Sequence, residues 1–138
     1  MPLSYTILPP LGIVYVRYDG EARLEETMEV FGRYAADPDF RPGLTQLVDL
    51  SRVTEFERDF MTLARSQAGK ADTMTGLRTP TLAVYYAPTQ VGLEMAQQIL
   101  KSWDGLDAVI VRIATDEAQA LEMLGLEISR FSDLPGYV

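Results

Sequence analysis

Short runs of β-branched and aromatic residues alternate along this chain with longer segments whose apolar residues recur every three or four positions. These two periods are typical of strands and of helices that bury one face. The short runs cover residues 5–8, 12–18, 45–50, 80–86 and 108–113, and the helical segments cover residues 24–36, 55–72, 91–103 and 115–125. Their order predicts an α/β fold with a mixed sheet of about five strands and about four helices, arranged ββαβαβαβα.

Proline and glycine indicate where the first segments end. Pro9-Pro10 separates the first two strands, which we expect to form a hairpin. The second strand is apolar at most of its early positions, which favours a central place in the sheet, and Asp19-Gly20 is expected to end it. The first helix is expected to stop near Ala36, because Asp37-Pro38 cannot continue it.

A capping box predicts where the second helix begins. Thr54 can accept a hydrogen bond from the backbone N–H of Glu57, whose side chain can reach back to the N–H of Thr54. We therefore expect a helix from about Glu55 to Asp72, directly after a strand that ends at Leu50. The last helix has similar signals, because Thr115 is placed as its N-cap, Asp116 and Glu117 are the two acids of its first turn, and Gly125 follows it.

The size of the chain predicts one domain. Its 138 residues, 47% of them hydrophobic, can bury a single core, so residues 1–138 are expected to fold together. Residues 127–138 have no regular period and are expected to pack on their own domain, although domains of this size commonly form twofold homodimers. No stretch approaches the roughly 20 apolar residues of a membrane span, and no signal peptide is recognisable. We therefore expect a cytoplasmic protein without membrane insertion.

The composition excludes several kinds of chemistry. The sequence has no cysteine and no histidine, which removes disulfides, cysteine zinc sites and Ser-His-Asp catalysis. The net charge of −8, without a basic stripe, disfavours nucleic acid as a partner. Neighbouring acids such as Asp37 and Asp39 have no metal-loop spacing, and no phosphate-binding glycine motif is present. Neither a metal nor another cofactor is expected.

One motif, together with the order of elements, resembles the SpoIIAA-like or STAS group, which includes anti-sigma-factor antagonists and the STAS/SEC14 type of bacterial protein. The motif spans residues 47–54, with the sequence LVDLSRVT. In the antagonists, a similar strand is followed by a serine that is phosphorylated at a helix start. The matching stretch here, residues 57–60, reads ERDF and has no serine. The chain is therefore more similar to the SpoIIAA-like subgroup without that switch, in which Gly20 and the acidic helix after it also have counterparts. The resemblance implies a regulatory or binding role.

Candidate site residues lie where the predicted parallel strands end, because ligands of open α/β sheets bind beyond the carboxyl ends of strands. They are Asp49, Ser51, Arg52, Glu57, Arg58 and Tyr86. The start of the second long helix would offer free N–H groups to an anion there. The alternative interpretation is structural: Asp49 and Ser51 satisfy backbone groups of a loop.

Three functional hypotheses follow. The first is a non-enzymatic regulatory domain that binds a protein partner through residues 49–57. The second is a carrier of a small apolar or lipid-like ligand, held between the sheet and helices that bear Met28, Met61 and Met95, because methionine adapts to varied partners. The third is an enzyme that uses Asp49, Arg58 or Tyr86, which would require these residues to share a pocket.

Overall fold

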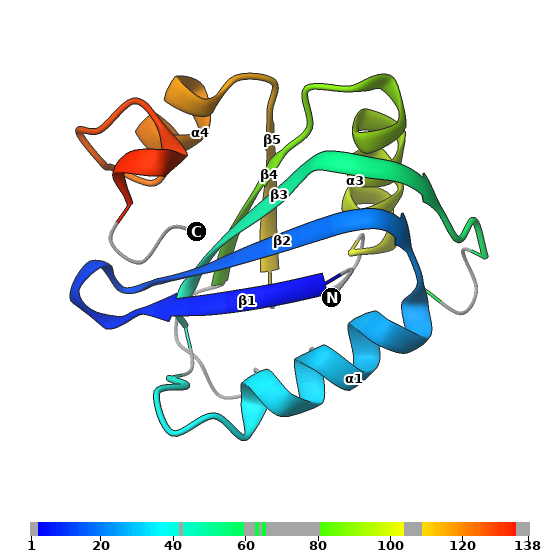
Figure 1. Ribbon diagram of the computed structural model, residues 1–138, viewed down its shortest axis with the longest axis horizontal. Coiled ribbons are helices and arrows are strands. Elements are labelled where there is room, and N and C mark those ends of the chain that lie inside the picture. The colour runs from blue at the N-terminus through cyan, green and yellow to red at the C-terminus, as the bar shows by residue number, and fades with distance from the viewer. Residues whose placement is uncertain are drawn as a thin grey trace.

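The computed structural model describes residues 3–41, 43–59, 63, 65, 81–103 and 109–134. Within these ranges, five strands form one sheet: β1 (Leu3–Leu8), β2 (Ile13–Ala22), β3 (Thr45–Phe56), β4 (Thr81–Tyr86) and β5 (Val109–Ala114). The α-helices with both ends in the described ranges are α1 (Leu24–Ala35), α3 (Gln90–Ser102) and α4 (Glu117–Met123). Figure 1 shows their arrangement. No helix in these described ranges is long and apolar enough to cross a membrane.

The strands lie in the sheet in the order in which they follow one another along the chain, β1 to β5. β1 and β2 are antiparallel and are joined by a short 3₁₀ helix at Pro9–Leu11, which confirms the predicted hairpin. All the other neighbouring pairs are parallel. The sheet is therefore mixed. β2 lies inside it and not at an edge, as its apolar sequence predicted.

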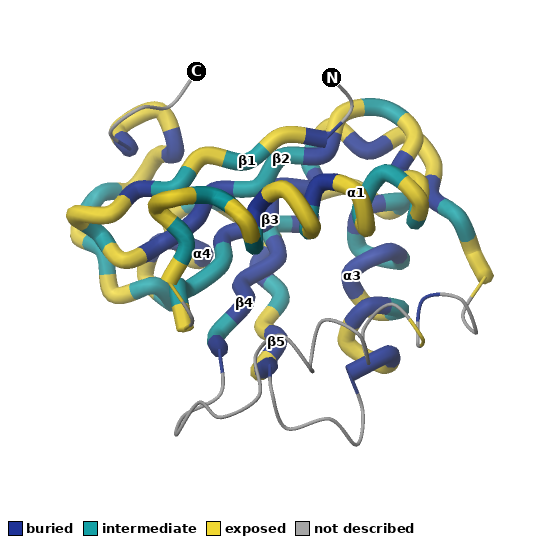
Figure 2. Tube along the Cα trace, turned by 90° about the horizontal axis from the view of Figure 1, so that it is seen from below, coloured by how far each residue is buried: buried dark blue, intermediate teal, exposed yellow. Residues whose placement is uncertain are grey.

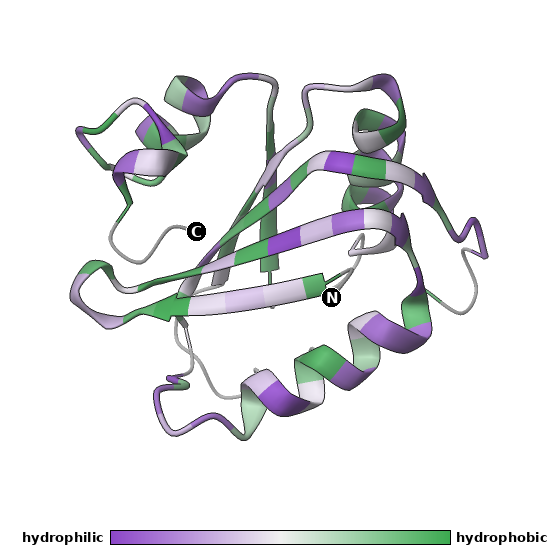
Figure 3. Cartoon of the chain, viewed as in Figure 1, coloured by the Kyte–Doolittle hydropathy of each residue, from purple (hydrophilic) through white to green (hydrophobic). Residues whose placement is uncertain are grey.

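Helices α1 and α3 cover one face of this sheet. The crossovers from β2 to β3 and from β4 to β5 advance in the same direction, so right-handed connections place both helices on the same side. Val30 of α1 and Ile99 of α3 share a core with Val48 and Tyr85 of the strands, which we call the first core. Figure 3 shows hydrophobic and hydrophilic stripes along α1, as expected of a helix with its apolar side on a sheet.

Helix α4 and the residues after it cover the opposite face. Leu121 of α4 and Phe131 of the tail pack with Leu47 and Val84 of the sheet, which we call the second core. Phe131 is only 2% exposed, and its backbone N–H donates to Glu117 Oε1 at 2.8 Å. The tail therefore packs on its own domain as far as Leu134. In Figure 2, buried residues concentrate in the strands and on the sheet-facing side of α3.

β2 and β3 continue together past the end of β4. The pairing of β3 with β4 stops at Asp49, and from there to Phe56 the only strand paired with β3 among the described residues is β2. We call this extension, residues 18–22 and 50–56, the β2–β3 arm. In Figure 1 it curves past the first turn of α3. The arm explains why two element boundaries predicted from the sequence are wrong.

The first wrong boundary is Asp19-Gly20, which does not end β2. Gly20 has a φ of 79° and lies beside a register shift in the β2–β3 ladder, so it belongs to a bulge and not to a turn. Tyr18 and Ala22, on either side, are buried in the first core. Their burial keeps this segment in the sheet.

The second wrong boundary is the capping box. Thr54 lies inside β3, which runs six residues beyond the predicted end at Leu50, so no helix starts there. Val53 and Phe56 are buried in the first core, and the extended backbone brings both of them to it. Because Glu55 and Phe56 belong to β3, the predicted helix over residues 55–72 cannot begin where its local pattern indicated.

Most of that predicted helix lies outside the described residues. Leu63 and Arg65 are helical, and the Leu63 N–H donates to the Asp59 carbonyl at 3.0 Å. The other helices agree with their predictions in position: α1 stops before Ala36, and α3 fills the predicted stripe. The N-cap of α4 is Asp116, which accepts from Gln119 N, and not Thr115 as predicted. Gly125 follows α4 with a φ of 76°, as its capping role predicted.

Candidate functional site

Asp49 lies well inside β3, which runs on to Phe56, and not next to a strand end at Leu50 as the sequence predicted. Its cross-strand neighbour is Tyr86, the last residue of β4, so Asp49 does lie level with one parallel strand end. Asp49 is 4% exposed. It faces the second core with Leu47, because alternate residues of a strand point to the same side.

Two donors satisfy the buried carboxylate of Asp49. The Tyr15 hydroxyl donates to Oδ2 at 2.6 Å, and the Ser51 backbone N–H donates to Oδ1 at 2.9 Å. The second bond is of the kind that the structural interpretation of Asp49 predicted. Ser51 enters the site through its backbone, at the point where β3 leaves β4 and continues into the arm.

Tyr86 borders this buried carboxylate and is partly exposed. Its ring lies edge-on to Phe131 of the tail, with centroids 4.9 Å apart. Burial raises the pKa of the Tyr86 phenol, and the nearby charges of Glu117, Asp49 and Asp116 raise it further. The Tyr86 hydroxyl is therefore a neutral hydrogen-bond donor at physiological pH.

Glu57 acts at the first turn of α1. Its Oε1 accepts from the backbone N–H of Leu24 at 3.2 Å and lies 4.0 Å from Arg23 Nε. Arg23, the N-cap residue, makes no side-chain cap of its own. A carboxylate from the residue that follows β3 thus satisfies a free amide of α1, where the helix dipole also favours negative charge.

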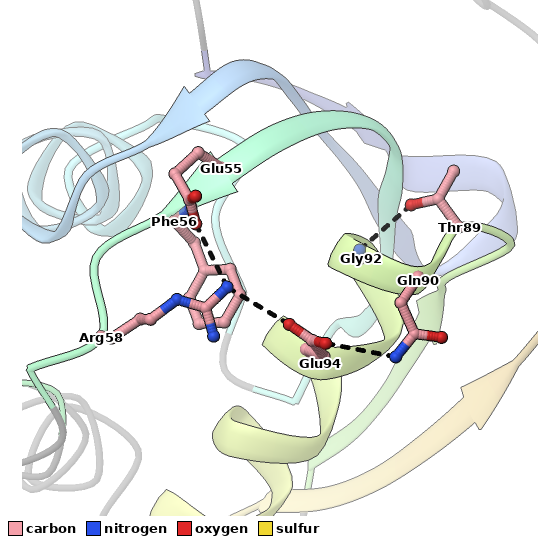
Figure 4. Close-up of polar contacts among 7 residues, drawn as sticks. All are labelled: Glu55, Phe56, Arg58, Thr89, Gln90, Gly92 and Glu94. Carbon is pink, nitrogen blue, oxygen red and sulfur yellow. Dashed lines mark hydrogen bonds and ion pairs between the residues drawn. The ribbon is translucent and has the colours of Figure 1, made fainter.

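Arg58 lies between two acidic side chains from different elements (Figure 4). One of its terminal nitrogens, Nη2, is 3.3 Å from Glu55 Oε1 and 3.2 Å from Glu94 Oε2 of α3. Its guanidinium carbon is 4.2 Å from the ring centroid of Phe56. Hydrogen bonds from Gln90 and from Arg58 lower the pKa of the Glu94 carboxyl. We call Glu55, Arg58 and Glu94 the charged rim.

Arg52 lies apart from both groups. It is the cross-strand partner of Asp19 in the β2–β3 arm, and Nη1 of Arg52 is 3.8 Å from Asp19 Oδ2. Both side chains are about half exposed. This pair is separate from the charged rim in its contacts.

The six candidate residues therefore do not come together in one polar site. Asp49, Ser51 and Tyr86 meet beside the second core, together with Tyr15, which the sequence did not single out. Glu57 and Arg58 lie where β3 ends near α1 and α3, and Arg52 is on the arm. Tyr15 pairs with Leu47, which points to the same face of β3 as Asp49 two residues later. The strand register therefore could have identified Tyr15 as a neighbour of Asp49.

A cleft between the sheet and the two helices of the first core was not predicted. It consists of two adjoining cavities of about 70 and 40 Å³, which share Tyr18, Thr27 and Tyr85 in their linings. Tyr5 and Tyr34 also line the larger cavity. We call this site the tyrosine cleft. These tyrosines come from β1, β2, α1 and β4, and each has the sequence signature of an ordinary core position.

The predicted methionine pocket does not form from the residues that the structure describes. Met28 is 53% exposed, on the outer side of α1. Met95 is buried and lines the smaller cavity, and Met61 lies outside the described residues. In the described part of the chain, no three acidic side chains come together in a group that could hold a metal ion.

The sequence matches no protein-family model, and no curated protein matches it.

Proposed function

We propose that this protein is a non-enzymatic, STAS-like regulatory domain that binds a protein partner through the charged rim. The observation that carries the proposal is the position of Arg58, which is half exposed, stacked on Phe56 and bonded to acids from β3 and α3. Arginine is enriched among the residues that dominate protein interfaces. The mixed five-stranded sheet agrees with the fold that the STAS resemblance implies.

The rim is a firm platform for such a partner. Thr89 caps α3 by accepting from Gly92 N at 3.0 Å, which fixes the first turn of the helix that carries Glu94. An ideal Cβ on Gly92 would lie 3.0 Å from the Leu50 carbonyl oxygen, so α3 and β3 are in close backbone contact. Glu55 and Glu94 lie on regular elements, which hold side-chain geometry better than loops do, and they bond Arg58 in the segment after β3.

Affinity capture with charge-reversed variants tests this proposal. We expect Arg58→Glu to lose at least one specific protein that the wild type retains, by about tenfold or more, because like charges then face Glu55 and Glu94. The matched control is Arg130→Glu, which makes the same charge change at an exposed position in the tail that covers the second core. Thermal unfolding of each variant checks that the fold is intact.

Two results would count against the protein-binding function. One is a set of captured proteins that is the same for the wild type and for Arg58→Glu. The other is turnover of a small molecule by the purified chain, which would favour the enzyme hypothesis.

A second candidate function is a carrier of a small apolar ligand, and the tyrosine cleft is the observation that favours it. The larger cavity is lined mainly by apolar side chains of β1, β2, β3 and α1. Native mass spectrometry of gently purified protein tests this function, with a bound small molecule as the expected result. Detection of the bare polypeptide mass alone would contradict it.

A further inference from the structure

We propose that the tyrosine cleft binds a compact, neutral, apolar molecule that carries one hydrogen-bond acceptor. This inference rests on the carrier function and names the class of ligand. The acceptor would bond the Tyr85 hydroxyl at the floor of the cleft, and the apolar part would lie against the side chains of the sheet and α1.

The hydroxyl groups of the cleft differ in whether they have partners. The Tyr18 hydroxyl lies 3.0 Å from Thr27 Oγ1, and the Tyr5 hydroxyl donates to Asp37 Oδ2 at 2.8 Å. Tyr85 is only 8% exposed and lines both cavities, yet its hydroxyl bonds to no residue in the described part of the chain. Among the described residues, Thr81 Oγ1 is the only buried side-chain oxygen or nitrogen without a partner, so the Tyr85 hydroxyl is accessible from the cleft and not sealed in the core. It can therefore donate to an acceptor on a ligand that enters the cleft.

The phenol of Tyr85 stays protonated over the physiological range. Burial raises its pKa, and the neighbouring Tyr18 raises it further. The cleft therefore offers an O–H donor, which suits a carbonyl, ether or amide oxygen. A charged ligand group is disfavoured, because the surrounding Val48, Val30 and Phe31 side chains cannot compensate its desolvation.

The volume of the cleft limits the size of the ligand. A cavity of about 150 Å³ is known to hold benzene. The two cavities here measure about 70 and 40 Å³, so the ligand they hold is smaller than benzene, with a chain of a few carbons as the upper limit. A long acyl chain does not fit this space, which makes the ligand smaller than the lipid-like molecule that the sequence suggested.

A titration with two probes of the same shape tests this inference. Butanone carries a carbonyl oxygen, and 2-methyl-1-butene has a methylene group in its place. We expect both probes to shift the backbone amide signals of Tyr18, Thr27 and Val48 in a heteronuclear NMR spectrum. Butanone should bind roughly tenfold more tightly, because it pairs the Tyr85 hydroxyl.

Two variants complete the test. Tyr85→Phe removes only the unpaired hydroxyl and should abolish the preference for butanone while the fold is kept. Tyr86→Phe, the matched control at the next residue on the opposite face, should keep that preference. Equal affinity for the two probes in the wild type, or an undiminished preference in Tyr85→Phe, would overturn the assigned ligand class without removing the carrier function. Absence of saturable shifts with either probe would overturn both.

Discussion

Asp49 is the one charged residue among those the structure describes that is classed as buried. Removing a carboxylate from water costs several kcal/mol unless hydrogen bonds compensate it. Here the Tyr15 hydroxyl and the Ser51 amide provide that compensation. Both bonds hold β3 at the residue where it separates from β4, so Asp49 stabilises the junction between the sheet and the arm.

Substitution of Asp49 should therefore affect stability first. Asp49→Ala should lower the free energy of unfolding by about 3 kcal/mol, because it leaves the Tyr15 hydroxyl and the Ser51 amide unpaired. Urea unfolding followed by circular dichroism measures this change. The control is Asp19→Ala, which breaks an exposed ion pair and should cost less than about 1 kcal/mol. An Asp49→Ala protein of wild-type stability that fails to bind its partner would instead make Asp49 a functional residue.

At the scale of elements, the contact between α3 and β3 depends on a residue without a side chain. A Cβ at Gly92 would lie 3.0 Å from the Leu50 carbonyl oxygen and 3.1 Å from Thr89 Oγ1, the cap of α3. The first atom belongs to the backbone of a central strand, which cannot easily move aside. Gly92 therefore sets the distance at which α3 packs on the sheet.

Two glycine substitutions in helices should have opposite effects. Gly92→Ala should destabilise the protein by about 1 kcal/mol or more, because overpacking against β3 outweighs the better helix propensity of alanine. Gly32→Ala in α1 meets nothing within 4 Å and should stabilise the protein by about 0.5–1 kcal/mol. Thermal unfolding of the two variants side by side distinguishes these directions. Equal effects of the two changes would show that the α3–β3 contact is looser than described.

Local signals predicted most of the elements, and they failed where pairing between distant segments decided the structure. The end of α1 near Ala36, the stop of α4 at Gly125 and the first hairpin depend on residues close in sequence, and these predictions are confirmed. In the arm, β2 and β3 pair with each other as far as Ala22 and Phe56. This long-range strand pairing replaces the local capping box of Thr54 and Glu57. Glu57 instead caps α1, which is 33 positions away from it in sequence.

The candidate site was predicted in part for the same reason. The sequence placed Asp49 and Tyr86 near one another, because parallel strands bring their carboxyl ends to one edge, and the register pairs them directly. It gave no indication of the tyrosine cleft. That cleft depends on which way side chains from four elements face, and this information is not present in any local pattern.

At the scale of the whole molecule, two cores lie on opposite faces of one sheet and differ in chemistry. The first core buries Tyr18 and Tyr85, and Tyr34 is buried beside the tyrosine cleft. Burial is the main reason that the pKa of each of these phenols is raised, to about 12 for Tyr34. In the unfolded chain a tyrosine titrates near pH 10. The folded state therefore holds protons that the unfolded state releases above that pH.

Alkaline pH should destabilise the protein through these tyrosines. Their contribution is fully present below about pH 10 and is lost as the pH rises toward the folded pKa values, by up to about 1.4 kcal/mol per pH unit for each group. Urea unfolding between pH 8 and 11.5 measures the slope, and absorbance at the tyrosinate band reports the titration. Tyr85→Phe should reduce the slope by roughly one group's share. A free energy of unfolding that stays constant from pH 9 to 11 would contradict the assignment.

The second core is completed by α4 and the tail up to Leu134, which come last in the described chain. During synthesis on the ribosome, the strands that carry Tyr15, Leu47 and Val84 emerge before the residues that cover them. Until α4 and the tail have left the ribosome, the nascent sheet exposes apolar side chains on that side, and chaperones bind such surfaces. Deletion of the segment after β5 should accordingly yield an aggregating polypeptide in cells, whereas deletions elsewhere at the surface should be better tolerated.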